Sequence, residues 1–533
     1  MELNVKRVLK NRSENDIFMN ILKDRGIEDL EEFLIPPVDN LHDFSSFKNI
    51  ERAGEILLDA IKENKKILVH ADVDNDGVSS GTIMVRYLKA IGCNVDWTIN
   101  DRKEHGVSSK LIAKVRELKP DVLFIVDSLD TESLDGYKMI KNEGTEIIVL
   151  DHHNIENLPY DEVVTLVSSN QGYENPELSG SGVCWKFCCY VDSLLGTMES
   201  EDLVDLAMSG IVSDMVDLSE DAKENRAIVN LGLNNLTNPA LRLINKGYEA
   251  NSKFISFSVS PKINACNRLN ENELAMNALL EDNPSKLKTL IKRMDECRTR
   301  QKDIVSHALP DLIEQLNQQK NCKVGIVVSD VIEGVNGLIA NQLCSDYQKP
   351  IIVLKEKDTC YSGSARGYGI ENFNAVCTST KCCTCAGHDN AFGISIAYNK
   401  FDEFREKVED ALKDVTFEQS FTVDAEILPT DVTRGLVEAI KKFDYISGQG
   451  SPAITFKIVI EDYEVSNMSK GKHLVLKTAN LECIQWNFNG DWDALEEAEL
   501  FNVPITCVGT LQSSYFGGRY KNQMILQTFE LNW

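Results

Sequence analysis

Short apolar runs alternate with amphipathic stretches between residue 64 and about residue 220. Three of the runs, residues 67–69, 122–126 and 147–150, are continuously apolar and have the length of buried strands. Continuous apolar strands that are separated by helices indicate a mostly parallel sheet covered on both faces. This part of the chain is therefore predicted to be α/β, and ligands of such a sheet bind at the carboxyl ends of its strands.

The pattern changes on either side of this segment. Residues 1 to about 60 are polar and of helical character, with a natural break at the Pro36-Pro37 pair. A single long helix is predicted from 284 to about 318, because Asn283 can cap it and Pro284 suits its first turn. Strands and helices alternate again from 322 to about 415, and residues 420–533 contain mainly short strands.

These changes divide the chain into five predicted parts. They are an N-terminal helical segment (1–60), a first α/β domain (61–250), a connecting helical region (251–320), a second α/β domain (321–417) and a C-terminal β-barrel of the OB-fold type (418–533).

The first apolar run leads into a group of ionisable side chains at alternate positions: His70, Asp72, Asp74 and Asp76. Alternate residues of a strand share one face, so these groups would repel one another unless a cation lay among them. Gly77 suits a tight turn above them. This stretch alone is explained equally well by an acidic surface turn or by a divalent metal site.

The other runs end in the same kind of residue. Asp127 follows the second run, Asp151, His152 and His153 follow the third, and the apolar segment 204–213 ends at Asp214. Because parallel strands present their carboxyl ends at one edge of a sheet, a set of unrelated surface acids becomes a weak alternative. Oxygen-rich ligation with imidazole suits two Mn²⁺ or Mg²⁺ ions better than a closed structural zinc.

The composition indicates the compartment and the kinds of partner that this chain is expected to have. Hydrophobic residues make up 43% of the 533 residues, and no apolar run approaches the length of a membrane span. Fifteen cysteines without regular spacing indicate reduced thiols, so we expect a cytoplasmic protein without membrane partners. The net charge of −27 argues against broad attraction to duplex DNA but leaves room for a narrow basic groove.

The order of these motifs resembles the DHH phosphoesterases. The family pattern His-x-x-x-Asp-x-Asp, a lone Asp, Asp-His-His and Gly-x-x-x-Asp is matched at residues 70–76, 127, 151–153 and 210–214. The wider chain is similar to the RecJ exonucleases of that family at residues 22–27, 33–36, 224–226, 230–233, 261–265 and 268–269. The resemblance implies a DHH domain, a DHH-associated domain and an OB-fold.

The resemblance also implies roles for the acidic residues and histidines. His70 and Asp74 would bind one divalent ion and Asp76 the other, Asp127 would bridge the two ions, and His152 and Asp214 would complete the second site. Of the residues expected to assist catalysis, Asp72 and Asp151 would orient ligands and His153 would touch the scissile phosphate. For Asp72, a direct ligand role and a simple capped turn remain equally open.

Substrate contacts are expected mainly from the second half of the chain. Residues 362–366 and 386–393 resemble the Gly-Ser-x-Arg and Gly-Gly-His elements of the DHH-associated domain. The resemblance therefore implies phosphate contacts by Lys262, Arg268, Arg366, Gly387 and His388. The chain departs from the family pattern at Lys262, where arginine is usual, and at Asn267 and Ala386, where glycine is usual. The departures concern phosphate contacts and leave the metal ligands intact.

Three further features of the sequence can each be interpreted in two ways. Basic residues of the long helix, such as Lys292 and Arg293, flank a phosphate path or lie on a solvated connecting helix. The aromatic and cationic stretch 515–521 binds single strands or packs into a β-barrel core. Cysteines between 377 and 385, together with His388, suggest zinc, but their spacing matches no common finger pattern.

The function implied by the resemblance is that of a metal-dependent 5′-to-3′ exonuclease. It would hydrolyse single-stranded DNA to mononucleotides in DNA repair, recombination or replication, as a monomer that a single-strand-binding protein or a helicase assists. One alternative is a small-substrate DHH phosphodiesterase of the nano-RNase or cyclic-dinucleotide type, against which the additional domain at 420–533 argues. The other is a noncatalytic replication partner, against which the complete set of metal ligands argues.

Overall fold

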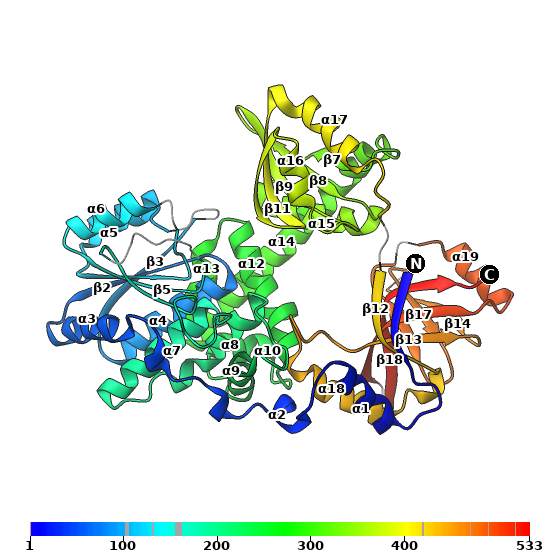
Figure 1. Ribbon diagram of the computed structural model, residues 1–533, viewed down its shortest axis with the longest axis horizontal. Coiled ribbons are helices and arrows are strands. Elements are labelled where there is room, and N and C mark those ends of the chain that lie inside the picture. The colour runs from blue at the N-terminus through cyan, green and yellow to red at the C-terminus, as the bar shows by residue number, and fades with distance from the viewer. Residues whose placement is uncertain are drawn as a thin grey trace.

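Three sheets form the framework of the protein (Figure 1). The computed structural model describes residues 2–101, 106–130, 133–154, 162–417, 420–469, 471–488, 490–516 and 519–533. The first sheet lies at the left of Figure 1, the second at the top, and the third at the right, beside both chain termini. Within these described ranges, no helix is long and apolar enough to span a membrane.

The first sheet is fully parallel, as the apolar runs predict. Its strand order is β3-β2-β4-β5-β6. The strands are β2 (Lys66–Ala71), β3 (Asn94–Ile99), β4 (Val122–Val126), β5 (Glu146–Asp151) and β6 (Thr165–Ser168). The prediction of an α/β domain is confirmed.

Helices cover both faces of this sheet, and alternate strand residues face the two layers. Val69 and Phe124 pack in the core with α3 (Ile50–Lys62), α4 (Asn75–Ala90) and α7 (Gly180–Leu195). Leu68 and Leu123 pack in a separate cluster with α5 (Ser109–Leu118) and α6 (Leu134–Asn142). Burial on both faces explains why β4 is apolar throughout and why β2 and β5 are apolar in their middle.

The helices that follow the sheet belong to the same core. They are α8 (Val204–Ser213), α9 (Lys223–Asn234), α10 (Pro239–Asn245), α11 (Ser252–Phe254), the π-helical η4 (Ile255–Val259), α12 (Ser260–Arg268) and α13 (Asn272–Leu280). The buried cluster continues through Ala250, Ile255 and Ile263 to Cys297. The expected boundary between residues 250 and 251 therefore does not coincide with a break in packing.

The predicted long helix is α14 (Pro284–Asn317), and Asn283 caps it through hydrogen bonds to the backbone amides of Ser285 and Lys286. Its first half packs against α12 and α13, and its last turns pack in the second α/β domain through Leu312 and Leu316. The helix thus joins the two domains, as Figure 1 shows.

The second α/β domain has a mixed sheet in the order β10-β11-β9-β8-β7. Its strands are β7 (Gly325–Val328), β8 (Ile351–Glu356), β9 (Cys360–Arg366), β10 (Cys383–His388) and β11 (Ala391–Ala397), and only β7 and β8 run parallel. Its helices are α15 (Glu333–Tyr347), α16 (Phe373–Ser379) and α17 (Phe401–Leu412).

The third sheet has eight strands in the order β1-β12-β13-β17-β18-β16-β15-β14. The C-terminal part contributes β12 (Ser420–Ile427), β13 (Thr455–Ile460), β14 (Glu464–Met468), β15 (His473–Lys477), β16 (Glu482–Gln485), β17 (Ile505–Phe516) and β18 (Arg519–Leu531), with helices α18 (Arg434–Phe443) and α19 (Trp492–Leu500). Within the described part of the chain, no strand pairing joins β1 to β14. The C-terminal β domain is confirmed, and the barrel is not.

The N-terminal segment, expected to be helical, begins with a strand. Strand β1 (Glu2–Val8) lies parallel to β12 at the edge of the third sheet, and only then do α1 (Glu14–Asp24) and α2 (Leu30–Leu34) follow. Arg25 donates two hydrogen bonds to the carboxylate of Asp424, at 3.0 and 2.7 Å. A half-exposed edge strand has a weak apolar pattern, and its partner lies more than 400 residues away, so local periodicity did not reveal it.

One buried arginine ties three distant segments together. Arg226 on α9 donates hydrogen bonds to the carbonyl oxygens of Leu218, Ile446 and Phe33, and its guanidinium lies 3.5 Å from the centre of the Phe33 ring. These carbonyls come from the first domain, from the segment after α18 and from α2. The contact therefore holds the N-terminal and C-terminal parts against the first domain.

Replacing Arg226 by alanine should lower the free energy of unfolding by about 3 kcal/mol, because it leaves buried carbonyl groups without a charged donor. Urea unfolding followed by circular dichroism measures this loss. The exposed Arg242 is the matched control, and Arg242→Ala should change stability by less than about 0.5 kcal/mol. Equal stabilities of the two variants would contradict the structural role of Arg226.

Candidate metal centre

The acidic residues and histidines of the sequence motifs meet at the carboxyl edge of the parallel sheet. Strand β2 leads into Asp72, and Asp74 caps the N-terminus of α4, where its side chain accepts a hydrogen bond from the Gly77 amide at 2.9 Å. Asp127 directly follows β4 and Asp151 ends β5. Asp214 caps the carboxyl end of α8 and approaches from the helical side.

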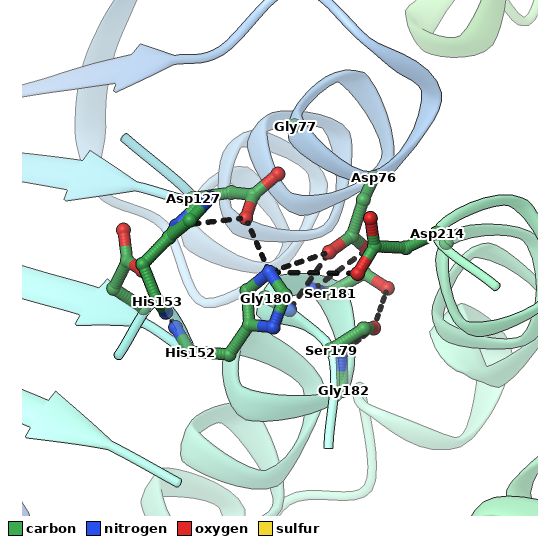
Figure 2. Close-up of polar contacts among 12 residues, drawn as sticks. Asp76, Gly77, Asp127, His152, His153, Ser179, Gly180, Ser181, Gly182 and Asp214 are labelled. Carbon is green, nitrogen blue, oxygen red and sulfur yellow. Dashed lines mark hydrogen bonds and ion pairs between the residues drawn. The ribbon is translucent and has the colours of Figure 1, made fainter. Parts of the chain in front are cut away.

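The imidazole of His152 lies at the centre of this group (Figure 2). Its Nε2 atom is 3.2 Å from Asp127 Oδ1, 3.6 Å from Asp214 Oδ2 and 3.9 Å from Asp76 Oδ2. Figure 2 shows the ring between Asp127 on one side and Asp76 and Asp214 on the other. The structure thus brings together four of the residues predicted to bind metal.

The N-terminus of α7 receives Asp76. The amide of Gly180 donates to Asp76 Oδ2 at 2.8 Å, and the amide of Ser181 donates to Oδ1 at 3.1 Å. Free amides and the helix dipole both favour a negative charge at this position. They stabilise one carboxylate of the cluster and fix its orientation.

Two glycines make this approach sterically possible. A Cβ atom on Gly180 would lie 2.6 Å from Asp127 Oδ1, and a Cβ atom on Gly210 would lie 2.0 Å from Asp76 Oδ1. Both distances are far below van der Waals contact. Gly210 is the glycine of the Gly-x-x-x-Asp motif, so this motif supplies both a close helix approach and the Asp214 carboxylate.

His70 is fully buried, and its ring is oriented by Asn100. His70 Nε2 lies 2.9 Å from Asn100 Oδ1, while the Asn100 amide nitrogen donates to Ser128 Oγ at 2.9 Å. Because an amide oxygen only accepts, Nε2 carries the proton and Nδ1 has a free lone pair. Burial lowers the pKa of His70 to about 4, so the ring is neutral at physiological pH and able to bind a cation.

His153 differs from His152 because it is held by Asp151. The His153 Nδ1 atom lies 2.7 Å from Asp151 Oδ1, and that carboxylate also accepts backbone hydrogen bonds from His152 and His153. The hydrogen bond and charge of Asp151 raise the pKa of His153 to about 9. Burial alone would raise the pKa of Asp151, but the bond and charge of His153 outweigh it and lower this pKa below its usual range. His153 is therefore a half-exposed cation at the rim of the cluster.

The remaining carboxylates repel one another. Burial, together with the charges of Asp72 and Asp76, raises the pKa of Asp74 to about 7. Burial and Asp76 raise the pKa of Asp214 to about 6, although nearby histidines, including His388, oppose this shift. Asp127 has a pKa well above its usual value for the same two reasons, burial and the charges of Asp76 and Asp74.

Divalent cations fit these residues. Two sets of ligand atoms lie close enough to share an ion, Asp127 with His152 and His153, and Asp76 with His152 and Asp214. Among the described residues, His70 Nδ1 is buried without a hydrogen-bond partner. Carboxylate oxygens with imidazole nitrogens suit Mn²⁺ or Mg²⁺. Cations would also remove the repulsion that raises the pKa values of the carboxyls.

The basic residues expected to bind substrate on α12 face the connecting helix. Lys262 forms an ion pair with Asp295 of α14, and Arg268 lies 3.5 Å from Gln301 of the same helix. The arrangement thus does not bring these two side chains into the acidic cluster. The basic residues of α14 keep both interpretations, as the flank of a phosphate path or as the surface of a solvated connecting helix.

The residues of the second domain that are expected to bind substrate lie at the ends of two strands of its sheet. Arg366 ends β9 and donates a hydrogen bond to the Ala365 carbonyl oxygen, whereas Gly387 and His388 end β10. Gly387 has a φ of +129°, which favours glycine. The charge of His388 lowers the pKa of Asp214, so the two side chains lie within electrostatic range of each other. The candidate metal-ligand sets found in the described ranges contain no cysteine.

The tyrosines of the stretch 515–521 are exposed, contrary to the interpretation of this stretch as part of a β-barrel core. Tyr515 and Tyr520 are 64% and 55% exposed, and their ring centres lie 4.8 Å apart. The Arg434 guanidinium lies 4.4 Å from the Tyr520 ring centre. Residues 517 and 518 of this stretch, and the side chains of Phe516 and Arg519, lie outside the described part of the structure.

Sequence reasoning missed three residues that support the cluster: Asn100, Gly180 and Ser181. Asn100 follows the carboxyl end of strand β3, as other site residues follow their strands, but β3 alternates polar and apolar residues and was not among the apolar runs. Gly180 and Ser181 follow Ser179, whose side chain caps α7 in a Ser-Gly-Ser-Gly sequence. That sequence predicts a helix start, but nothing local shows that the helix points at Asp76.

The fold and the cluster together define the class of protein. Residues 66–211 match the model of the DHH family, N-terminal domain. The chain is similar to the DHH family over these residues and to RecJ proteins over most of its length, which confirms the resemblance seen in its motifs.

Relatives cover nearly the whole chain. It is 26% identical to YorK of Bacillus subtilis, a prophage-derived protein provisionally named a single-strand DNA-specific exonuclease, over 97% of this chain and 96% of YorK. It is 27% identical to the single-stranded-DNA-specific exonuclease RecJ of Bacillus subtilis, over 95% of this chain and 67% of RecJ. The crystal structure of Thermus thermophilus RecJ in complex with Mn²⁺ has the same fold, with a TM-score of 0.80, 21% identity and coverage of 99% of this chain and 79% of that one.

Replacing Asp74 by asparagine should stabilise the metal-free protein above neutral pH. A carboxyl whose pKa rises from its ordinary 3.8 to about 7 on folding disfavours the folded state increasingly from pH 4 to pH 7. Asparagine keeps the helix cap and removes the charge. We expect Asp74→Asn to be more stable than wild type by roughly 2 kcal/mol at pH 8 and equally stable near pH 4.

Urea unfolding in the presence of EDTA at several pH values measures this difference. Asp96→Asn is the matched control, because Asp96 lies on β3 with a half-exposed side chain. Asp96→Asn should change the free energy of unfolding by less than about 0.5 kcal/mol. A stability gain for Asp74→Asn that is the same at pH 4 and pH 8 would contradict the repulsion among the buried carboxyls.

Proposed function

We propose that this protein is a metal-dependent exonuclease that hydrolyses single-stranded DNA. The observation that carries the proposal is the convergence of Asp76, Asp127, His152 and Asp214 at the carboxyl edge of the sheet. Similarity to RecJ and YorK along almost the entire chain supports single-stranded DNA as the substrate. The 5′-to-3′ direction and the mononucleotide product rest on the resemblance alone.

The metal ligands we propose are those that the motifs imply. His70 and Asp74 would hold one ion, and Asp76, His152 and Asp214 would hold the other, with Asp127 as a further ligand. Support comes from the lone pair of His70 Nδ1 and from the short distances around His152. Asp72 belongs to the same group of repelling carboxyls, since its charge raises the pKa of Asp74, and we propose that it orients the ligands.

When bound, two divalent cations would lower the pKa of an attacking water and stabilise charge on the phosphate. The residues of the chain position the substrate. His153 keeps its proton at neutral pH because Asp151 occupies Nδ1, so Nε2–H can donate to a phosphate oxygen. Asp151 holds the ring and the preceding backbone in place. This hydrolysis needs no covalent nucleophile.

We propose that the second domain and the C-terminal sheet bind the rest of the strand. Gly387, His388 and Arg366 would contact phosphates near the metal cluster, which the electrostatic effect of His388 on Asp214 supports. Lys262 and Arg268 would contribute from α12 only if they release Asp295 and Gln301. A cavity of about 760 Å³ beside Tyr520 offers a stacking contact farther along the strand. Its three basic residues, Arg434, Lys477 and Lys521, are matched by Asp462, Glu464 and Glu482 in the same lining.

Degradation of a 20-nucleotide single-stranded DNA labelled at either end tests the function. Wild type with Mn²⁺ or Mg²⁺ should release 5′-terminal mononucleotides early, whereas Asp127→Ala should be slower by more than about a hundredfold, because it loses a carboxylate shared by both ion sites. Asp96→Ala, which changes a carboxylate on β3 away from the cluster, should retain full activity.

Other outcomes separate the alternatives. Cleavage confined to oligomers of two to five nucleotides would favour the small-substrate phosphodiesterase. A protein that binds the strand but cleaves neither substrate with either metal would favour the noncatalytic partner. Release from the 3′ end would contradict the proposed direction and leave the metal centre unaffected.

The exposed tyrosines give a separate prediction for strand binding. Tyr515→Ala combined with Tyr520→Ala should weaken binding of a 20-nucleotide strand by about tenfold or more, because stacking contributes about 1–3 kcal/mol per base. Fluorescence anisotropy with Ca²⁺ in place of the catalytic metal measures the affinity. Tyr248→Ala, at a residue that is 75% exposed on the first domain, is the control. Unchanged affinity in the double variant would exclude a stacking role for this pair.

A further inference from the structure

Two cysteines of the second domain form a close pair beside the candidate substrate residues. Cys383 and Cys385 lie two positions apart on β10, so their side chains share one face of the strand. Their sulfur atoms are 3.7 Å apart, and both residues are only partly buried. Neither residue has a part in the proposed hydrolysis.

The surroundings of the pair differ from those of other thiols in the protein. Hydrogen bonds from Cys383 and Thr378 lower the pKa of Cys385 to about 7, whereas the same interaction and burial raise the pKa of Cys383. By contrast, burial raises the pKa of Cys93 and of Cys344 to about 11. At neutral pH, Cys385 is therefore substantially a thiolate next to a protonated thiol, which is the arrangement of a reactive pair.

Strand β10 is easily deformed. It is the edge strand of its sheet, and β11 is its one neighbouring strand in the described sheet, where Cys383 pairs with Ile396 and Cys385 with Ile394. The adjacent α16 adds a hydrogen bond from the Asn374 side chain to the Gly387 carbonyl oxygen. The same strand ends at Gly387 and His388, and the charge of His388 acts on the pKa of Asp214 in the metal cluster. A change at the cysteines is therefore transmitted along one short strand to the substrate side.

We propose that Cys383 and Cys385 are an oxidation site for hydroperoxides, at which a disulfide forms and weakens the hold of the β10 tip on the substrate. The site rests on the sulfur distance and on the position of the pair on an edge strand. Its effect on catalysis rests on the proposed exonuclease function, whereas disulfide formation does not.

The oxidation balances with hydrogen peroxide as the only added reactant. The Cys385 thiolate attacks one peroxide oxygen, the O–O bond breaks, and the leaving hydroxide takes a proton from solvent to become water. The Cys385 sulfenic acid is then attacked by Cys383 sulfur; an S–S bond forms, and the departing hydroxide takes the Cys383 proton. Two thiols are oxidised to one disulfide, and one peroxide is reduced to two waters.

Such a disulfide would distort the strand. Two steps along an extended strand separate the Cα atoms by about 6.8 Å, at the upper limit for bridged cysteines, so closure pulls the two residues together. The pairs with Ile394 and Ile396 would then shift, and Gly387 and His388 would move with them. A strained disulfide is also readily reduced, which makes the change reversible.

Peptide mapping of the full-length protein after treatment with hydrogen peroxide tests the site itself. We expect a peptide that lacks two hydrogens and links Cys383 to Cys385, formed at lower peroxide concentration than any oxidation of Cys93. Cys385→Ser should abolish the link. A pair that stays reduced while Cys93 is oxidised would overturn the proposal.

Oligonucleotide cleavage after removal of peroxide by catalase tests the consequence. The oxidised wild type should cleave single-stranded DNA at least fivefold more slowly, and dithiothreitol should restore the rate. Cys383→Ser and Cys385→Ser should keep the rate of untreated enzyme after peroxide, whereas Cys93→Ser should behave like wild type. A mapped disulfide that leaves cleavage unchanged would overturn the coupling to the substrate side. If the reduced protein cleaves no DNA, the proposed function fails, and peptide mapping still decides the oxidation site.

Discussion

Repulsion among buried carboxylates is the constraint on which the centre of this protein depends. Asp74, Asp76, Asp127 and Asp214 meet at one edge of the parallel sheet, where burial and like charge raise the pKa values of three of them. The protein offsets part of this cost with the N-terminal amides of α7 at Asp76. The remaining repulsion favours cation binding, so the same feature that destabilises the metal-free cluster creates its affinity for metal.

The two neighbouring histidines of the cluster have different contacts and therefore different expected roles. His152 lies among the carboxylates, whereas His153 is bound to Asp151 and points to the half-exposed rim. The two rings lie side by side, with their centres 4.7 Å apart, and it is the hydrogen bond to Asp151 that distinguishes His153 from His152. The pairing of His153 with Asp151 keeps that ring charged at a place where a phosphate would bind.

The arrangement of the domains depends on contacts between distant parts of the chain. Strand β1 is part of the C-terminal sheet, and Arg226 joins carbonyl groups of three segments. Helix α14 shares one core with the first domain and another with the second. These connections join the second domain and the C-terminal sheet to the domain that carries the metal cluster.

The sequence by itself determined the parallel sheet, the long α14 and the identity of the acidic cluster, because burial on both faces, helix caps and strand ends are local properties. Only the tertiary structure decided that β1 pairs with β12, that Asn100 orients His70, and that Gly180 and Gly210 allow helices to approach the carboxylates. The strand order of the C-terminal sheet and the contact of Lys262 with α14 were also decided only by the tertiary structure. Each of these depends on which surfaces meet across long sequence separations, and periodicity records that a residue is buried without recording its partner.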